Sequence, residues 1–379
     1  MKGFTTLAML AGVTTGATLS GDVSDNKHGT ALHRSTRPAI YHHQQRRGDS
    51  NSCNGYGELC SKRFNEVAYA TTHNSYAHGD NIAANQNKDI RQQLDDGIRG
   101  FMLDLYKLGS GSSNEPYLCH TSCTLLNGGK LVDALKDFKT FLDANKREVV
   151  TIFIENGQPF SATEMAKAFK DAGLEDYAFS PSDASSSSSA DDSSAKDAFE
   201  WPSLTDMIDA GKRLVVFTDS KADAAVPWIL NEGSYAVQTS FAVEEGSSFD
   251  CKPLKQIQPL WVMNHFVFTN YTVLGYNFER PAPNSAGSVN TLNSIVDQSK
   301  LCSSAGHFAN FVTVDYYDVG DTFKAVAKIN GVDYKSTAVD TFPNDSKDDA
   351  TSAAATSSTA VLSLAAVTAL FSAGSALLW

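Results

Sequence analysis

The sequence predicts an α/β protein in which a single large domain forms a TIM, or (β/α)8, barrel. Apolar stretches typical of buried strands alternate along the chain with stretches typical of helices, which is the pattern of a parallel sheet with helical crossovers. The segment with this pattern, residues 53–340, has the length of one such barrel. An open doubly wound sheet is the alternative. It usually has a glycine-rich phosphate loop after its first strand, whereas here the first strand ends in the sequence TTHNS at residues 71–75.

The individual elements follow from periodicity and from helix-start signals. In the helix predicted over residues 131–145, apolar side chains recur at helical spacing, at Leu131, Leu135, Phe138 and Leu142. The strand predicted over 148–155 is almost wholly apolar, as expected of a strand buried on both faces. Ser161 with Glu164 forms a capping box that opens a further helix. In chain order, we expect strands over residues 66–72, 98–106, 148–155, 213–219, 260–265 and 310–315, and helices over 88–96 and 131–145 and from Ser161 and Ser203 onward.

Both ends of the chain are predicted to lie outside the barrel. Residues 1–20 have a basic start, an uncharged apolar run and small residues, which is the pattern of a signal peptide. Residues 21–52 are polar and are interpreted as a flexible leader. Residues 341–379 form a polar stalk and a hydrophobic tail, as in a glycosylphosphatidylinositol (GPI) attachment signal, with Ser352 and Ala353 as attachment sites. A membrane-spanning tail is the alternative, but it would usually carry a basic flank. We therefore expect a GPI-anchored protein on the cell surface.

Composition bounds the partners. With 42% hydrophobic and 20% charged residues the chain can bury a sizeable core, and its formal net charge of -12 argues against nucleic acid as a partner. Residues 182–198, rich in Ser, Asp and Ala, are predicted to be a disordered insertion in the barrel. We expect a monomer.

Six cysteines in a secreted chain predict disulfides. Many pairings are open, and joining sequence neighbours gives Cys53–Cys60, Cys119–Cys123 and Cys251–Cys302. A zinc site is less favoured, because Cys119 and Cys123 have no second close Cys or His pair to complete it. Asn270 and Asn344 lie in glycosylation sequons, which predicts a glycoprotein.

Polar side chains collect where the predicted strands end. They are His73, Asn74, Asp104, His120, Glu155, Asp219 and Asp315. In a (β/α)8 barrel the carboxyl ends of the strands meet at one mouth, where the active sites of this fold lie. A structural acid that caps the next helix is the common alternative, and we assign it to Asp219. The whole set indicates an active site at the mouth.

Four motifs in chain order resemble the catalytic X domain of phosphatidylinositol-specific phospholipase C. Residues 70–76 (ATTHNSY) are similar to that family's first histidine motif, and residues 97–104 (GIRGFMLD) to its second strand. His120 stands where the second histidine is expected, and residues 149–156 resemble the next strand with its glutamate. The resemblance is strongest over residues 66–157 and is one of rhythm beyond them. It implies a single catalytic TIM-barrel domain.

The resemblance implies a phosphoric diester hydrolase that acts on phosphatidylinositol-type lipids or GPI-like glycolipids. His73 would be the base that removes a proton from the inositol hydroxyl beside the phosphodiester, so that this hydroxyl attacks phosphorus. His120 would be the acid that protonates the leaving diacylglycerol oxygen. Histidine suits both roles because its free pKa is about 6.5.

The resemblance also implies a divalent cation, because negative charge builds on the phosphate during transfer. Asn74, Asp104 and Glu155 match oxygen ligands of the calcium-binding, animal-type members. One ligand is missing, since Met102 stands where those members have the glutamate of a Glu-x-Asp pair. Strand alternation puts Met102 and Asp104 on the same inward face. We expect a weakly bound cation, Ca²⁺ by resemblance, with Mg²⁺ as the alternative.

Lys221, Tyr316 and Tyr317 follow later strands and are candidates for holding a phosphate or a sugar.

Two other functions stay open. Sphingomyelinase-D-like and glycerophosphodiester phosphodiesterase barrels also pair two histidines with acidic metal ligands, but they usually keep the Glu-x-Asp pair that is broken here. A barrel that binds lipid or glycan headgroups without turnover is the other, and the presence of both His73 and His120 argues against it.

Overall fold

The computed structural model describes residues 51–109, 115–183, 200–273 and 276–342. The predicted signal peptide, nearly all of the leader and nearly all of the Ser/Asp-rich insertion lie outside the described residues. So do the stalk and tail beyond residue 342, with Asn344, Ser352 and Ala353.

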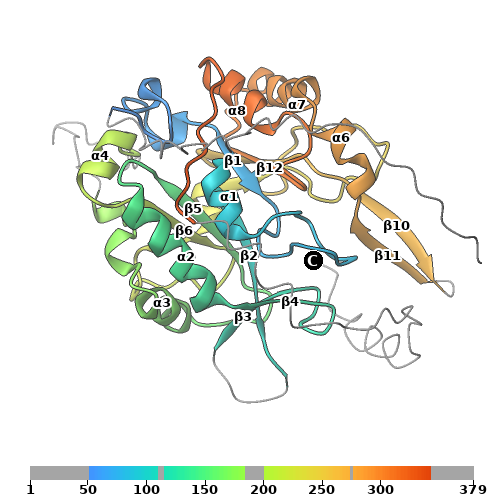
Figure 1. Cartoon of the computed structure of the whole chain (residues 1–379), viewed down its shortest axis with the longest axis horizontal. Coiled ribbons are helices and arrows are strands. Elements are labelled where there is room, and N and C mark those ends of the chain that lie inside the picture. Colours follow the sequence, from blue (N-terminus) through green and yellow to red (C-terminus); the bar gives the residue numbers. More distant parts are fainter. Residues whose placement is uncertain (1–50, 110–114, 184–199, 274–275, 343–379) are drawn as a thin grey trace, which may run out of the picture. The chain divides into compact units, whose positions relative to one another are not determined.

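Eight parallel strands form the central sheet (Figure 1). They are β1 (Tyr69–Thr72), β2 (Gly100–Lys107), β5 (Val150–Glu155), β6 (Leu214–Thr218), β7 (Ile229–Asn231), β8 (Ala236–Gln238), β9 (Leu260–Asn264) and β12 (Phe311–Val314). Their order in space is β7-β6-β5-β2-β1-β12-β9-β8, so the first strand pairs with the last. This order confirms the predicted barrel. No ladder joins β7 to β8 in the described part of the chain, and the barrel is open at that seam.

Helices connect most of these strands. They are α1 (Ile90–Asp96), α2 (Leu131–Ala144), α3 (Ala162–Asp171), α4 (Leu204–Asp209), α5 (Glu232–Tyr235), α6 (Ala286–Val289), α7 (Leu292–Ser304) and α8 (Thr322–Asn330), with 3-10 turns at Gly57–Leu59, Phe64–Glu66, Glu175–Tyr177, Pro181–Asp183 and Pro283–Ser285. The predicted capping box at Ser161 is present, and the predicted helix start at Ser203 has one as well: each serine accepts a hydrogen bond from the backbone N–H three residues on. None of the described helices is long and apolar enough to span a membrane.

Two hairpins were absent from the sequence-based expectation. β3 (Pro116–His120) and β4 (Leu126–Lys130) pair antiparallel with each other, and β3 also pairs with the end of β2. β10 (Phe268–Val273) and β11 (Tyr276–Pro281) form a separate two-stranded sheet between β9 and α6. The first hairpin matters for function, because it extends β2 past the mouth of the barrel and ends its first strand at His120.

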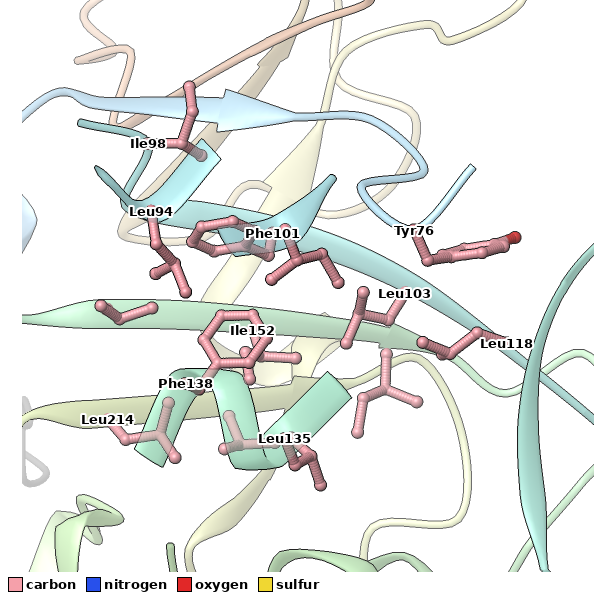
Figure 2. Close-up of a cluster of buried hydrophobic side chains, with 14 of the residues drawn as sticks. Tyr76, Leu94, Ile98, Phe101, Leu103, Leu118, Leu135, Phe138, Ile152 and Leu214 are labelled. Carbon is pink, nitrogen blue, oxygen red and sulfur yellow. The ribbon is translucent and has the colours of Figure 1, made fainter. Parts of the chain in front are cut away.

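The outward faces of the strands pack against the helices. Phe101 and Leu103 of β2 and Ile152 of β5 lie under Leu135 and Phe138 of α2 (Figure 2). All five side chains are essentially inaccessible to solvent. The rings of Phe101 and Phe138 meet edge to face, with centroids 4.8 Å apart. This layer fixes β2 and β5 side by side, in the register that places Asp104 beside Glu155.

The inward faces form a second apolar cluster inside the barrel. Phe153, Phe217 and Phe311 lie at its centre, with the rings of Phe153 and Phe311 4.8 Å apart. Met102 packs partly against this cluster. Because side chains alternate along a strand, the next inward positions after Met102 and Phe153 are Asp104 and Glu155. The apolar cluster is thus the floor beneath the polar mouth.

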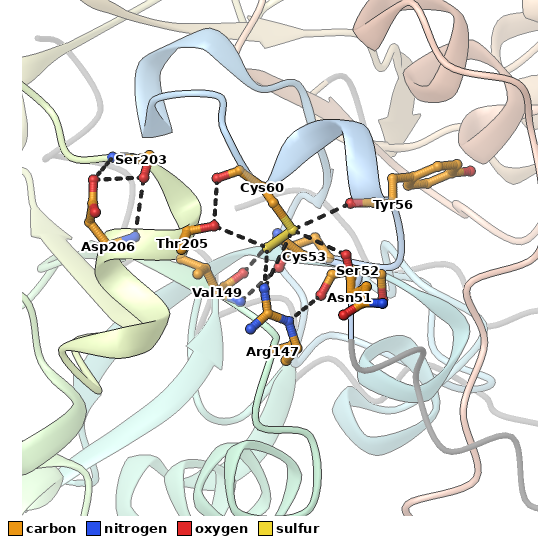
Figure 3. Close-up of a disulfide and its surroundings, with 11 residues drawn as sticks. Asn51, Ser52, Cys53, Tyr56, Cys60, Arg147, Val149, Ser203, Thr205 and Asp206 are labelled. Carbon is orange, nitrogen blue, oxygen red and sulfur yellow. Dashed lines mark hydrogen bonds between the residues drawn. A yellow bond between two sulfur atoms is a disulfide. The ribbon is translucent and has the colours of Figure 1, made fainter.

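The three predicted disulfides are all present: Cys53–Cys60, Cys119–Cys123 and Cys251–Cys302. The first closes a short loop upstream of β1 that contains the 3-10 turn Gly57–Leu59 (Figure 3). Its surroundings include the guanidinium of Arg147, whose Nη2 lies 3.1 Å from the sulfur of Cys53. Arg147 precedes β5, so this disulfide lies at the end of the barrel opposite to Glu155.

Candidate active site

The carboxyl ends of β1, β2, β5 and β12 bring four titratable side chains to the barrel mouth. His73 directly follows β1, Asp104 and Glu155 are paired positions of β2 and β5, and Asp315 directly follows β12. His120 comes from the end of β3. His73, Asp104 and Asp315 come from β1, β2 and β12. These strands are neighbours because β1 pairs with both β2 and β12.

His73 is oriented by a carboxylate. Its Nδ1 lies 2.9 Å from Oδ1 of Asp315, and the side chains are 25% and 9% exposed. Nδ2 of Asn85 donates to both oxygens of Asp315, at 3.0 and 3.1 Å. The imidazole stacks on the ring of Phe266, with centroids 4.0 Å apart. A carboxylate beside Nδ1 holds the proton there, which leaves the lone pair on Nε2. His73 thus presents a basic Nε2.

His120 is oriented by a backbone carbonyl. Its Nδ1 donates to the carbonyl oxygen of Ala83 at 2.7 Å, so the neutral ring has its lone pair on Nε2. The pKa of His120 is lowered, mainly by burial and further by the charge of His73, while the bond to Ala83 opposes the shift. A histidine with a lowered pKa is a stronger acid once protonated.

Asn74 lies between the histidines and the acidic side chains. One end of its amide is 3.2 Å from Nε2 of both His73 and His120, and the other end is 3.0 and 3.2 Å from the two carboxylate oxygens of Asp104. With Nδ2 toward the histidines, the amide donates to unprotonated rings and its oxygen faces Asp104. With the amide turned round, Nδ2 donates to Asp104 and the oxygen accepts only from protonated rings. Asn74 thus contacts both histidines on one side and Asp104 on the other.

The acidic side of the mouth holds Asp104 and Glu155. Burial raises the pKa of Asp104 well above its ordinary value, and the neighbouring charge of Glu155 raises it further. The hydroxyl of Tyr76 donates to Oδ2 of Asp104 at 2.8 Å and opposes that shift. The pKa of Glu155 is also raised, first by the protein atoms around it and then by the charge of Asp219. A carboxylate whose pKa is raised by burial and by a neighbouring carboxylate gains from a bound proton or cation.

These residues fit a weak cation site. The amide of Asn74 lies 3.0 and 3.2 Å from the two carboxylate oxygens of Asp104, and Asp104 pairs in register with Glu155. Amide and carboxylate oxygens are the ligands of Ca²⁺ and Mg²⁺. Among the described residues, no group of three or more His, Cys, Asp or Glu side chains could hold a metal ion. A cation here would therefore need the amide oxygen of Asn74 as a ligand. Met102, in the floor, supplies no oxygen.

The remaining predicted residues have other partners or are exposed. Lys221 is exposed in the loop between β6 and β7 and has a positive φ of 63°. The hydroxyl of Tyr316 is buried and donates to the carbonyl oxygen of Ala84 at 2.5 Å. Tyr317 donates to Asp96 at the end of α1. Asp219 accepts from the backbone N–H of Asn156, so it ties two strand ends together and does not cap a helix. The structure gives neither tyrosine hydroxyl a place at the histidines.

Sequence reasoning missed the partners of the histidines. Asn85 lies in the irregular loop between β1 and α1, where no periodicity points to it, and Ala83 acts through its carbonyl oxygen. Asp315 was recognised as a strand-end acid, but its pairing with His73 was not. The signal available was the closure rule of barrels, by which the last strand lies beside the first.

The sequence of this chain matches one protein family and several known proteins. The chain matches the PI-PLC X domain family over residues 59–330. It is similar to "PI-PLC X domain-containing protein 1" of Arthroderma benhamiae, with 34% identity over 292 residues, 74% of this chain and 90% of that protein. An "Uncharacterized secreted protein" of the same fungus is 30% identical over 307 residues, which cover 76% of this chain and 65% of that protein.

A plant protein and a solved bacterial structure are more distant. A PI-PLC X domain-containing protein of Arabidopsis thaliana is 27% identical over 71% of this chain and 62% of its own length. The phosphatidylinositol-specific phospholipase C of Listeria monocytogenes superposes with a TM-score of 0.45 at 14% identity, covering 73% of this chain and 96% of that one. The match over residues 59–330 and the 34% identity to a fungal X-domain protein settle the family: this chain belongs to the PI-PLC X domain family.

Proposed function

We propose that this protein is an extracellular phosphodiesterase of the phospholipase C type, which cleaves the phosphodiester of a phosphatidylinositol-type lipid or a GPI-like glycolipid. One observation carries the proposal. Nε2 of His73 and Nε2 of His120 both lie 3.2 Å from the same amide group of Asn74. Two imidazoles that face one point suit a reaction in which one takes a proton and the other gives one.

His73 acts as the general base. With Nδ1–H held by Asp315, its Nε2 takes the proton of the inositol hydroxyl beside the phosphodiester, and the hydroxyl oxygen then attacks phosphorus. The imidazolium that forms is stabilised by the carboxylate of Asp315. This is the role that an orienting acid has beside a catalytic histidine.

His120 acts as the general acid. Its Nε2–H gives a proton to the diacylglycerol oxygen as the bond to phosphorus breaks, and a cyclic phosphate is left. The lowered pKa of His120 favours this donation once the ring is protonated. If water opens the cyclic phosphate, the two histidines exchange roles.

A divalent cation, Ca²⁺ or Mg²⁺, would be held by Asn74, Asp104 and Glu155. It would neutralise charge on the phosphate oxygens. The fit of the amide and carboxylate oxygens supports this assignment. With Met102 in place of a fourth oxygen ligand, we propose weak binding.

We also propose that the protein acts outside the cell. All six cysteines are paired, as is usual in oxidising compartments, and one relative is described as a secreted protein. Asn270 is exposed on β10 and is a glycosylation site in this proposal. Mass spectrometry of the secreted chain would show a glycan at Asn270 and a GPI group at Ser352 or Ala353.

The test uses the full chain, produced in a secretory host, with vesicles of phosphatidylinositol. Release of water-soluble inositol phosphate is followed with Ca²⁺, with Mg²⁺ and with a chelator. We expect turnover that falls by at least about 10²-fold in His73→Ala. His78→Ala, at an exposed position of the same loop between β1 and α1, is the matched control and should keep full activity.

Each contrary result points to another function. Turnover of phosphodiesters that lack a neighbouring hydroxyl would favour a sphingomyelinase-D-like or glycerophosphodiester-cleaving enzyme. Headgroup binding without turnover of any substrate would make the protein a binding module. Activity that is unchanged by the chelator would remove the cation from the proposal but leave the two histidines in it.

A further inference from the structure

His120 lies inside a small disulfide ring. Cys119 and Cys123, four positions apart, are bonded, so the ring encloses His120, Thr121 and Ser122. Cys119 is fully buried in β3, whereas Cys123 is half-buried in the turn that follows. The disulfide therefore fastens the turn after His120 to the buried strand before it.

The turn has a conformation that needs such a constraint. Thr121 has a φ of 61°, in the left-handed region that is costly for a β-branched residue. Strained positions of this kind persist only where the surroundings over-determine them. The hydrogen bond from the N–H of Ser122 to the carbonyl oxygen of His120, at 2.6 Å, is local to the turn. The N–H groups of Leu125 and Leu126 also bond to the carbonyl oxygen of Ser122, and the Cys119–Cys123 disulfide adds a covalent link from the turn to the buried strand.

The geometry of His120 depends on this backbone. Its Nδ1 reaches Ala83 at 2.7 Å and its Nε2 lies 3.2 Å from the amide of Asn74. The carbonyl oxygen of Cys119 itself lies 2.9 Å from the hydroxyl of Tyr76, the side chain that donates to Asp104. A shift of Cys119 would therefore disturb both the acid and the carboxylate beside it.

We propose that the Cys119–Cys123 disulfide is a positioning element for the general acid, which holds Nε2 of His120 where the leaving oxygen departs. The inference rests on the proposed two-histidine function. His73 is held by different elements, through Asp315 after β12 and Asn85 before α1. Loss of the disulfide therefore slows protonation of the leaving group and spares the attack by the inositol hydroxyl.

The experiment compares two inositol phosphodiesters that differ only in the leaving group. Diacylglycerol leaves as an alkoxide and needs a proton, whereas nitrophenolate leaves without one. In Cys119→Ala/Cys123→Ala we expect kcat for the lipid to fall by about 10- to 100-fold, while kcat for the nitrophenyl ester stays near that of the unmutated protein. A purely structural role would lower both rates together.

Two further variants make the result specific. Cys53→Ala/Cys60→Ala removes the disulfide at the other end of the barrel (Figure 3) and should change the two rates by the same factor. In a His120→Ala background, removal of Cys119–Cys123 should cost nothing more on the lipid, because the acid that it positions is gone. If the double variant fails to fold, Cys123→Ala alone breaks the bond at the half-buried end and leaves the buried strand residue in place.

The outcomes separate this inference from the proposed function. Equal losses on both substrates, or a loss that adds to that of His120→Ala, would overturn the positioning role. The rate loss in His120→Ala could depend on the leaving group while the rate loss in the disulfide variant does not. In that case only the positioning role of the disulfide is refuted. If His120→Ala shows no such dependence, the assignment of the acid fails and the inference with it.

Discussion

The two histidines of the site are held by different partners, and this difference supports the two roles that we propose for them. A carboxylate beside Nδ1 of His73 holds a proton on that nitrogen and leaves the lone pair on Nε2, which suits a base. His120 has only a backbone carbonyl at Nδ1 and is buried, so its protonated form is disfavoured and gives up its proton readily. Local environment thus makes one side-chain type serve both steps.

The orienting role of Asp315 predicts the effect of Asp315→Asn. The amide can donate to Nδ1, which would leave the proton on Nε2 of His73, the wrong tautomer for a base. We expect kcat to fall by about 10²- to 10⁴-fold with little change in KM. Steady-state kinetics on phosphatidylinositol check this, and a variant with ordinary kcat would contradict the pairing.

The lowered pKa of His120 predicts a pH dependence. The acid must be protonated, and its proton is lost as pH rises through a pKa below the ordinary histidine value of about 6.5. We expect kcat/KM for the lipid to decline on the alkaline side from a midpoint below about 6.5. The measurement is kcat/KM between pH 4 and 8, and the decline should vanish with the nitrophenyl substrate. A midpoint above 7 would be inconsistent with this environment for the acid.

Met102 predicts a gain of cation binding on substitution. Met102 and Asp104 share the inward face of β2, so a carboxylate at position 102 would complete the oxygen set of Asn74, Asp104 and Glu155. We expect Met102→Glu to bind Ca²⁺ at least about tenfold more tightly, since another anionic ligand raises affinity. Calorimetric titration measures this, with Met102→Gln as the uncharged control. Equal affinity in all three proteins would place the cation elsewhere.

At the scale of elements, a buried ion pair joins the segments that lead into β2 and β5. Nε of Arg99 donates to Oε2 of Glu148 at 2.8 Å, and the side chains are 5% and 9% exposed. The guanidinium also donates to the carbonyl oxygens of Leu94 and Ile98 and lies over the ring of Phe141. The pair thus ties the end of α1, the start of β2 and the residue before β5 to one another.

Removal of one partner should be costly. Glu148→Gln would leave the Arg99 guanidinium buried without a counter-charge, and we expect the free energy of unfolding to fall by about 3–5 kcal/mol. The exposed pair of Lys300 and Asp297 in α7 is the control, and Asp297→Asn should cost less than about 1 kcal/mol. Urea unfolding measures both. Equal small effects would mean that solvent reaches Arg99.

At the scale of the whole molecule, the segment after α8 returns across the barrel and binds the end of α1. The carboxylate of Asp95 accepts from the backbone N–H groups of Thr341 and Phe342, both at 2.9 Å. Earlier in the same segment, the carbonyl oxygen of Lys335 accepts a hydrogen bond from the hydroxyl of Tyr56 at 3.0 Å. The last described residues are thus tied to the first part of the barrel.

Asp95→Ala should loosen this return segment. Two hydrogen bonds to a charged acceptor are lost, and we expect the free energy of unfolding to fall by about 2 kcal/mol, with faster proteolysis after residue 331. Asp95→Asn keeps one oxygen acceptor and should lose less. Catalytic rates should stay the same, because Asp95 lies at the end of α1 that faces away from the strand ends. Cleavage of both proteins at equal rates would show that other contacts hold the segment.

The sequence alone determined the parts of this protein that depend on neighbours along the chain. Alternating apolar patterns located the long strands, Ser161 and Ser203 marked helix starts, and sequence neighbours gave all three disulfides. It also predicted the side chains that stand at the strand ends. Such signals are local, because helix periodicity, capping and short loop closure involve residues a few positions apart.

Only the tertiary structure decided which of these residues meet. Asp315 orients His73 because β12 closes against β1, across a sequence separation of 242 residues. Asn85 and the carbonyl oxygen of Ala83 join the site from an irregular loop. The hydroxyl of Tyr316 donates to the carbonyl oxygen of Ala84 in the same loop. These contacts depend on strand order and on backbone direction, which many sequences with the same local patterns could satisfy differently. The sequence therefore showed which side chains stand at the strand ends, whereas the order of the strands in the barrel determined which of them are partners.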